Sequence, residues 1–358
     1  MIFRIREFNH GFPQPPNPHE RHHNLANRLP RRPPIPHRSP SPRPKRKRSP
    51  DKKYLHRLKL HRHVPVPHSS SLPLFLTKTT RNFRSCLYPT PLPYTPGIEA
   101  EGHIISSPTP DLLPGDKVVW IGSGAYAEYS TCSISKIFRL PKSDTIGEGV
   151  AAASIAQGIT ALSFIERAYA VRKGEWILVQ GASGGVGLWL CQLLSKLIGA
   201  RVIGTAGSEE KMELARKNGA EVVVNYKTDN VVKKVMEVTG GEGVRAVFDN
   251  AGKATFEVGL QVLGRDGSMV VVGNASGNVE PFDIGKLAGK NLRVMKPSVF
   301  GYIGTREEFG FYAGRLFDFI AKNGVEEIPR KVFLLEEVRK AHVELEERKS
   351  AGKLLLKV

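Results

Sequence analysis

In the middle of the sequence, a short apolar run leads through small residues into an apolar stretch with helical spacing. Residues 176–180 read WILVQ, residues 181–187 read GASGGVG, and apolar side chains recur at helical intervals up to residue 198. A buried strand, a tight turn and a helix in this order open a dinucleotide-binding βαβ unit. The chain is therefore predicted to contain an α/β domain with a parallel sheet.

The turn itself carries the size pattern of a pyrophosphate-binding loop. Ala182, Gly184 and Gly187 occupy the three glycine positions of G-x-G-x-x-G, with alanine in the first. The first residue must be small for the turn, the second admits the pyrophosphate, and the third lets helix and strand pack closely. The phosphates then accept hydrogen bonds at the positive end of the helix dipole. We predict that Ala182, Gly184, Gly185, Val186 and Gly187 bind a cofactor; a glycine turn without a ligand is the alternative.

Charge divides the chain of 358 residues unevenly. Residues 1–80 carry 18 Lys and Arg against 3 Asp and Glu, and hold 15 of the 26 prolines. Such a segment lacks the apolar surface that would offset the entropy of ordering, so we predict a disordered basic tail over 1–80. The run PKRKR (44–48) is either a nuclear address or nucleic-acid contact, or a solvated basic stretch. We favour the solvated stretch over a nucleic-acid partner, which the basic tail leaves open.

Cysteine use and hydropathy indicate where the protein works. The chain has three cysteines, Cys86, Cys132 and Cys191, which are far apart and form no C-x-x-C pair. This spacing argues against a disulfide framework or structural zinc and fits a reducing compartment. No apolar run reaches membrane-spanning length and no signal peptide follows Met1. We expect a cytoplasmic protein with no membrane partner.

The remaining chain is predicted to divide into three parts. Residues 81–150 form a small β-rich domain, with strands expected at 98–106, 116–121 and 125–134. Residues 151–300 alternate strands and helices at a spacing that favours a doubly wound parallel sheet with right-handed crossovers. Residues 301–358 return to the β-rich domain through helices at 305–322 and 336–349 and strands at 331–334 and 353–358.

From residue 84 to its end, the chain resembles the zinc-independent medium-chain dehydrogenases/reductases, specifically NADPH:quinone oxidoreductases of the zeta-crystallin type. The motifs that carry the resemblance are RSCLY (84–88), PGIEAEG (96–102), GSGAYAEY (122–129), QGIT (157–160), GASGGVG (181–187), GNASG (273–277) and GYI (301–303). The resemblance implies a GroES-like β domain beside a Rossmann domain, and hydride transfer from NADPH to a small-molecule quinone. We also expect a homodimer.

Two other functions remain open at this point. An enone or enoyl-thioester reductase of the same family would share these motifs. A non-catalytic, crystallin-like protein that binds NADPH or RNA would also be compatible with the basic tail. One departure from the family bears on all three, because the proline-rich region before residue 84 does not match it. We therefore expect a partial GroES-like domain, with near-normal NADPH binding and poor quinone turnover.

The sequence excludes a catalytic zinc of the kind that related dehydrogenases use. Zinc-using relatives carry Gly-His-Glu where this chain has Gly97, Ile98 and Glu99, and isoleucine cannot ligate a metal. Beyond residue 80 only two histidines remain, His103 and His342, whereas a catalytic zinc needs three protein ligands. We expect no metal, and we expect Glu99 and its neighbour Glu101 to be structural rather than an acid–base pair.

The end of the next predicted strand indicates which dinucleotide is bound. An NAD site normally has an acid there for the ribose diol, but residues 205–208 read TAGS. Ser208 and Lys211 instead offer a hydrogen bond and a cation to a 2′-phosphate. The resemblance assigns the same role to Lys211 and adds Tyr226, although a surface lysine and a packed aromatic are the plain alternatives. We predict NADPH, while Glu209 is near enough to accept a ribose diol.

Two asparagines are expected at the ligand-binding edge of the sheet. Asn250 and Asn274 follow the third and fourth predicted strands after the glycine turn, at the carboxyl ends where ligands bind. The resemblance adds Arg348, a C-terminal arginine near the cofactor, for which a surface arginine is the alternative. These three residues complete the predicted cofactor site.

The catalytic residues are less clearly indicated. The resemblance places the hydroxyl of Thr160 near the nicotinamide, and a threonine at a helix N-terminus is the alternative. Tyr88 and Tyr302 are the aromatic candidates for the substrate side, with core packing as the alternative for both. No histidine or cysteine is positioned to protonate a reduced quinone, so we expect water or Tyr88 to do so. The predicted catalytic residues are therefore Tyr88 and Thr160.

Overall fold

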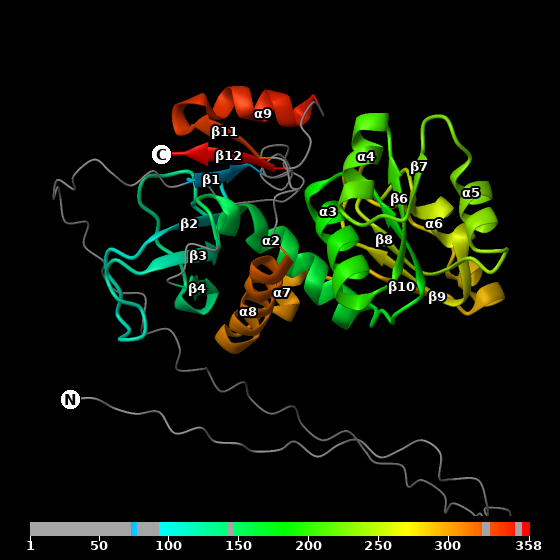
Figure 1. The fold of residues 1–358 in the computed structure, drawn as a ribbon, viewed down its shortest axis with the longest axis horizontal. Coiled ribbons are helices and arrows are strands. Elements are labelled where there is room, and N and C mark those ends of the chain that lie inside the picture. The colour runs from blue at the N-terminus through cyan, green and yellow to red at the C-terminus, as the bar shows by residue number, and fades with distance from the viewer. Residues whose placement is uncertain (1–72, 77–92, 142–145, 324–329, 348–352) are drawn as a thin grey trace, which may run out of the picture. The chain divides into compact units, whose positions relative to one another are not determined.

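Two six-stranded sheets organise the chain, as the computed structural model shows (Figure 1). The structure describes residues 73–76, 93–141, 146–323, 330–347 and 353–358. The strands of the first sheet are ordered β11-β12-β1-β2-β3-β4, and those of the second β10-β9-β8-β5-β6-β7. Every paired strand of the second sheet is parallel, which confirms the predicted α/β fold class.

The second sheet is doubly wound around its central strand. Its strands are β5 (Trp176–Gln180), β6 (Arg201–Ala206), β7 (Val222–Asn225), β8 (Val244–Asp249), β9 (Leu263–Val271) and β10 (Arg293–Met295). Its helices are α3 (Gly185–Gln192), α4 (Glu209–Lys217), α5 (Val231–Val238) and α6 (Phe256–Val262). The chain winds outward from β5 to β7, then returns beside β5 and continues to β10, so the order reverses at β5. Ligands bind at the carboxyl ends of the strands at such a reversal.

Alternation along the central strand explains the two helical layers. Ile177 and Val179 join the core cluster that includes α3, whereas Leu178 joins the cluster that includes α5 and α6. Successive side chains of a strand point to opposite faces, so an apolar strand such as β5 needs cover on both. Figure 1 shows α3 and α4 on one side of this sheet and α5 and α6 on the other.

The first sheet contains strands from both ends of the described chain. They are β1 (Pro73–Leu76), β2 (Glu99–His103), β3 (Lys117–Ile121), β4 (Ile137–Arg139), β11 (Arg330–Leu334) and β12 (Lys353–Lys357). The prediction of a strand at 125–134 is wrong, because this segment is irregular and ends in the 3-10 turn Ile134–Lys136. Its residues 128–131 are exposed and have no buried face, and only Ala125 and Tyr126 bond to the neighbouring 96–97 segment.

Strand β1 corrects the predicted boundary of the disordered tail. It pairs antiparallel with β12, from Pro73 opposite Lys357 to Leu76 opposite Leu354, and Leu74 pairs with Ala100 of β2. The expectation of disorder over 1–80 is therefore wrong for residues 73–76, because two strands that are distant in sequence supply the pairing. Residues 1–72 and 77–80 lie outside the described part, so the prediction for them is not tested.

The remaining elements pack between and beside the sheets. They are α2 (Val150–Ser163) with its π-helical extension Phe164–Ala168, the π-helical Leu193–Ile198, the 3-10 segments Ile284–Lys290 and Leu335–Glu337, α7 (Val299–Tyr302), α8 (Arg306–Asn323) and α9 (Val338–Glu346). One apolar cluster joins α2, α3 and α8 with β3 of the first sheet. Trp189 of α3 is fully buried in it, with its ring 6.4 Å from that of Phe319, while Trp120 is buried in the first sheet. None of the helices that the structure describes is long and apolar enough to span a bilayer.

Candidate functional site

The turn after β5 is fixed to the neighbouring strand by backbone and hydroxyl contacts. Gly181 adopts a positive φ of 70°, and its N–H donates to Oγ1 of Thr205 at 3.1 Å. The N–H of Ala182 donates to the carbonyl of Thr205 at 3.0 Å, and that of Gly184 closes the turn onto Gly181 at 3.1 Å. Thr205 is buried near the end of β6, so the position of this turn is set by the sheet itself.

Space around the turn explains its residue sizes. A Cβ on Gly187 would lie 2.3 Å from the carbonyl oxygen of Gly181 and 2.7 Å from that of Ala182, so the third position admits only glycine. The methyl group of Ala182 is fully buried and faces Gly204 of β6, where a Cβ would approach it to 2.8 Å. Alanine fits the first position because its partner strand supplies a glycine there.

The first turn of α3 has the properties of an anion site. The helix has Gly184 as its N-cap, with no side-chain cap, and Leu188 N–H donates to the Gly184 carbonyl at 2.9 Å. The N–H groups of Gly185, Val186 and Gly187 precede that bond, so the helix offers them no carbonyl of its own. A Cβ on Gly184 would touch only the Gly181 carbonyl, at 3.4 Å, which leaves the approach to the turn open. These features fit a pyrophosphate.

The end of β6 brings together three of the residues predicted for the adenosine phosphate. Ser208 is the N-cap of α4 and its hydroxyl accepts the N–H of Lys211 at 3.4 Å. Tyr226 follows β7, its N–H donates to the Ala206 carbonyl at 3.1 Å, and its phenol lies over Gly207. A Cβ on Gly207 would lie 2.5 Å from the Tyr226 hydroxyl. Ser208 and Tyr226 therefore meet at one short loop, and Lys211 stands in the first turn of α4 directly after it.

The acid nearest to this loop is directed away from it. Glu209 begins α4, but its Oε1 accepts a hydrogen bond from Nη1 of Arg216, 2.7 Å away and two turns further along the helix. A carboxylate held along α4 is poorly placed for a ribose diol at the end of β6. This arrangement favours a 2′-phosphate over a free diol at this position.

The carboxyl ends of β8, β9 and β10 form a polar network. Nδ2 of Asn250 donates to the Gln180 carbonyl at 3.0 Å, and Oδ1 of Asn274 accepts a bond from Nζ of Lys296 at 2.9 Å. The fully buried carboxylate of Asp249 accepts bonds from Thr255 Oγ1 and the Ala251 N–H, both at 2.8 Å. Burial raises the pKa of Asp249, while these hydrogen bonds lower it. The network fixes the loops on which both predicted asparagines stand.

Lys296 is a residue of this network that sequence reasoning missed. It directly follows β10, and burial lowers its pKa while the charge of Asp249 raises it. The only sequence signal was a lysine placed after the last parallel strand. A lysine after a strand is too common a pattern to single out Lys296. Its partner Asn274 stands in a different loop, so the sequence around Lys296 does not indicate their contact.

Two predicted catalytic and aromatic candidates have specific contacts. The hydroxyl of Thr160 donates to the Ala156 carbonyl at 2.6 Å, and Thr160 lies late in α2, so it is not an N-terminal threonine. Its lone pairs can accept a bond from a ligand. Tyr302 packs edge-to-face on Phe164, with 5.9 Å between ring centroids, which fits the packing alternative. Tyr88 and Arg348 lie outside the described residues, so their roles stay predictions.

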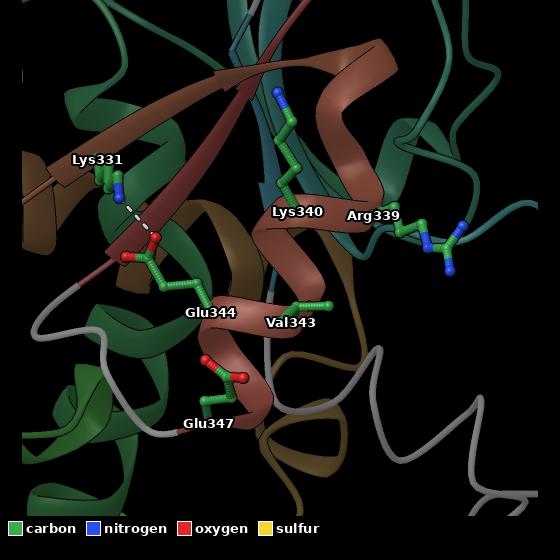
Figure 2. A pocket seen from close by; sticks show the side chains of 6 residues that line it. All are labelled: Lys331, Arg339, Lys340, Val343, Glu344 and Glu347. Atoms are coloured by element: carbon green, nitrogen blue, oxygen red, sulfur yellow. Dashed lines mark hydrogen bonds and ion pairs between the residues drawn. The ribbon is translucent and has the colours of Figure 1, made fainter.

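Two surface hollows lie away from the glycine turn. The larger, about 600 Å³, lies along β11 and α9 and is lined by Lys331, Arg339, Lys340, Val343, Glu344 and Glu347 (Figure 2). Lys331 pairs with Glu344 across it at 2.5 Å, and Lys340 pairs with Glu337 at 3.0 Å. The second, about 310 Å³, is lined by residues of β4, α8 and the 111–112 loop. Because both lysine charges are paired and two carboxylates, Glu344 and Glu347, also line it, the larger hollow is a poor anion site.

Glu101 has a structural role. Its two carboxylate oxygens accept the N–H groups of Gly149 at 2.7 Å and Ala152 at 3.0 Å, which caps the first turn of α2. The described residues contain no group of three or more His, Cys, Asp or Glu side chains that could hold a metal. The donor set in this part of the chain therefore does not fit a zinc site.

The chain resembles known proteins in both sequence and structure. The zinc-binding dehydrogenase family matches residues 185–313. A quinone oxidoreductase of Salmonella typhimurium is 40% identical over 76% of this chain and 85% of its own length. A probable quinone oxidoreductase of Schizosaccharomyces pombe is 38% identical over 76% of this chain and 83% of its length. The Escherichia coli quinone oxidoreductase solved with NADPH has a TM-score of 0.74 and 34% identity, over 82% of this chain and 94% of that one.

Proposed function

The chain belongs to the quinone oxidoreductase family of the zinc-independent medium-chain dehydrogenases/reductases, and we propose that it reduces quinones with NADPH. The observation that carries this proposal is the combination of two features on one parallel sheet. The uncapped first turn of α3 suits a pyrophosphate, and Ser208, Lys211 and Tyr226 stand at the end of β6, where Glu209 bonds to Arg216 along α4. When bound, NADPH supplies the hydride.

The protein's contribution to the cofactor site is recognition and orientation. The N–H groups of Gly185, Val186 and Gly187 hold the pyrophosphate, and Ala182 and Gly184 keep its approach open. Ser208, Lys211 and Tyr226 hold the 2′-phosphate, where a lysine adds a charge-assisted hydrogen bond. Asn250 and Asn274, with Arg348, are proposed for the remaining cofactor contacts.

The chemistry on the substrate side needs a proton as well as a hydride. A quinone that accepts hydride develops negative charge on oxygen, which must be stabilised and then protonated. Tyr88 or water is proposed as the proton source. Thr160 donates its own hydrogen to Ala156, so we propose that its lone pairs accept an N–H from the nicotinamide side.

The division of the chain is also a proposal, with one corrected boundary. Residues 81–150 and 301–358, together with β1, form the GroES-like domain, and residues 151–300 form the NADPH-binding domain. The assembly is proposed to be a homodimer through the free side of β10, which ends the strand order of its sheet. Nearby Ile284, Met295 and Phe300 expose 76%, 42% and 52% of their surface. Edge strands with exposed apolar neighbours favour pairing with a second chain.

The cellular location is proposed from the thiols. Cys132 and Cys191 are free, and burial raises the pKa of both thiols, to about 11 and about 12 respectively. Free, protonated thiols suit a reducing compartment, so we propose the cytoplasm.

Initial rates of NADPH oxidation test the proposed reaction. The assay compares a benzoquinone and a naphthoquinone with a cyclic enone and an enoyl thioester, and measures NADPH affinity separately by calorimetry. We expect quinones to be the best substrates. Compared with other members of the family, we expect a low kcat/KM for quinones and a similar affinity for NADPH, because the residues before Tyr88 depart from the family. Faster turnover of enones or thioesters would identify the alternative reductase. NADPH binding without turnover of any acceptor would identify a non-catalytic protein.

A further inference from the structure

A buried ion pair lies beside the glycine turn and takes no part in the site described above. Glu99 of β2 is fully buried, and Lys353, the first residue of β12, is 4% exposed. Nζ of Lys353 lies 2.6 Å from Oε1 of Glu99 and donates a second bond to Oε1 of Gln157, also at 2.6 Å. Nε2 of Gln157 donates back to Oε1 of Glu99 at 3.2 Å. We call these side chains the Glu99–Lys353–Gln157 triad.

Burying the triad costs free energy of desolvation. When two charges leave water, the free energy of hydration that they lose is only partly offset by their attraction to each other. Proteins with apolar residues of similar size in place of such a pair are often equally stable. Burial lowers the pKa of Lys353, and the charge of Glu99 opposes that effect. Such a pair is better explained by what it holds in place than by stability alone.

What the triad holds is the amide of Gln157. Its oxygen accepts from Lys353 and its nitrogen donates to Glu99, so both ends of the amide are engaged. Glu99 also accepts the N–H of Ala156 at 2.9 Å, which ties the carboxylate to the same part of α2. With its amide engaged at both ends, the side chain of Gln157 is restricted to a narrow set of rotamers.

The stem of Gln157 reaches the glycine turn. Its Cγ lies 3.2 Å from the position that a Cβ of Gly185 would occupy, and Gly185 is the first residue of α3. Helix α2 contacts both β2 of the first sheet and α3 of the second (Figure 1). A fixed side chain on α2 therefore packs against Gly185, the first of the three residues whose N–H groups are proposed to hold the pyrophosphate.

We propose that the Glu99–Lys353–Gln157 triad positions the first turn of α3 for the cofactor. The ion pair from β2 and β12 fixes Gln157, and Gln157 limits where the N–H groups of residues 185–187 stand. The triad touches neither cofactor nor substrate, so its members are positioning residues. This inference rests on the proposed NADPH site at the glycine turn.

Calorimetry with two ligands tests the triad. NADPH needs both the glycine turn and the end of β6, whereas adenosine 2′-phosphate carries only the group proposed for the end of β6. The variants are Gln157→Ala, which keeps α2 helical, and the double variant Glu99→Gln/Lys353→Met, which removes both buried charges together. We expect the Kd for NADPH to rise at least about tenfold in both variants. The Kd for adenosine 2′-phosphate and kcat at saturating NADPH should stay within about twofold of wild type, since a change that small is under about 0.5 kcal/mol.

The matched control is Glu101→Gln. Glu101 is as buried as Glu99 and also bonds to α2, but its bonds go to Gly149 and Ala152 at the far end from the glycine turn. We expect it to lower the melting temperature without changing either Kd. Folded Gln157→Ala that binds NADPH like wild type would overturn the proposal, as would equal losses for the two ligands. A wild-type chain that binds no NADPH would instead overturn the proposed function.

Discussion

The two halves of the candidate cofactor site are proposed to recognise phosphate in different ways. At the glycine turn the proposed contacts come from backbone N–H groups, and the space beside Gly187 is closed by the carbonyl oxygens of Gly181 and Ala182. At the end of β6 the proposed contacts come from the side chains of Lys211, which is half-buried, and Tyr226, which is exposed. The first half depends on glycines that have no side chain, and the second depends on the charge of Lys211. Substitutions should therefore act through packing in one half and through electrostatics in the other.

Gly187→Ala should have the largest effect of the substitutions that probe this contrast. Its Cβ would lie 2.3 Å from a backbone oxygen that cannot move away without shifting the turn. Overpacking of this kind costs about 1–3 kcal/mol of stability. Because α3 must shift, we expect the Kd for NADPH to rise at least about a hundredfold. Calorimetry gives the affinity and circular dichroism the melting temperature.

Gly310→Ala is the matched control for Gly187→Ala. Gly310 lies inside α8, and its Cβ would meet nothing within 4 Å. We expect unchanged NADPH affinity and slightly higher stability, because alanine favours a helix more than glycine. A folded Gly187→Ala variant with wild-type affinity for NADPH would contradict the claim that close packing at Gly187 determines cofactor binding.

Lys211→Glu should have the next largest effect, and one that depends on the ligand. A charge-assisted bond to a phosphate contributes about 1.5–3 kcal/mol, so NADPH affinity should fall roughly ten- to a hundredfold. NADH lacks the 2′-phosphate, and its affinity should change far less. Lys217→Glu, at the other end of α4, controls for the change in net charge. Equal losses for NADPH and NADH would show that Lys211 does not read the 2′-phosphate.

Gly207→Ala should have a small effect despite an overlap similar to that at Gly187. Its Cβ would lie 2.5 Å from the hydroxyl of Tyr226, but that side chain is 53% exposed and can swing aside. We expect wild-type stability and a rise of about two- to threefold in the Kd for NADPH. A loss as large as that of Gly187→Ala would mean that Tyr226 is as rigid as the backbone of the glycine turn.

Chelation should have no effect on either half of the site. Prolonged dialysis against a chelator should leave the rate of NADPH oxidation unchanged, because Ile98 stands where zinc-using relatives have a ligand. Metal analysis before and after dialysis is the matching measurement. Loss of stoichiometric zinc together with activity would contradict the argument from Ile98.

The parallel sheet could be predicted because its signals are local. The alternation expected over residues 151–300 comes from local periodicity and turn residues, and the structure places β5 to β9 within this range. The glycine turn was predictable for the same reason. Its size pattern reports contacts between residues close in sequence, such as Gly187 with Gly181.

Elements that depend on distant partners could not be predicted. Strand β1 is four residues long, stands among prolines, and forms only because β12 and β2 pair with it. Lys353 and Glu99 are 254 positions apart, so neither residue signals the other in the sequence. The strand expected at 125–134 was wrong because a local signal had no distant partner. The segment begins with apolar residues, but the residues after them are exposed and have no face to bury.

The positions of the tryptophans allow the unfolding of each sheet to be followed separately by fluorescence. Of the three in the chain, Trp120 lies in the first sheet, while Trp176 begins β5 and Trp189 lies in α3. Indole emission shifts to longer wavelength when water reaches the ring. With Trp120→Phe the emission comes only from the parallel sheet and α3, whereas Trp176→Phe/Trp189→Phe leaves only the first sheet visible. Coincident denaturation curves for the two variants would show that both sheets lose their structure in one cooperative step.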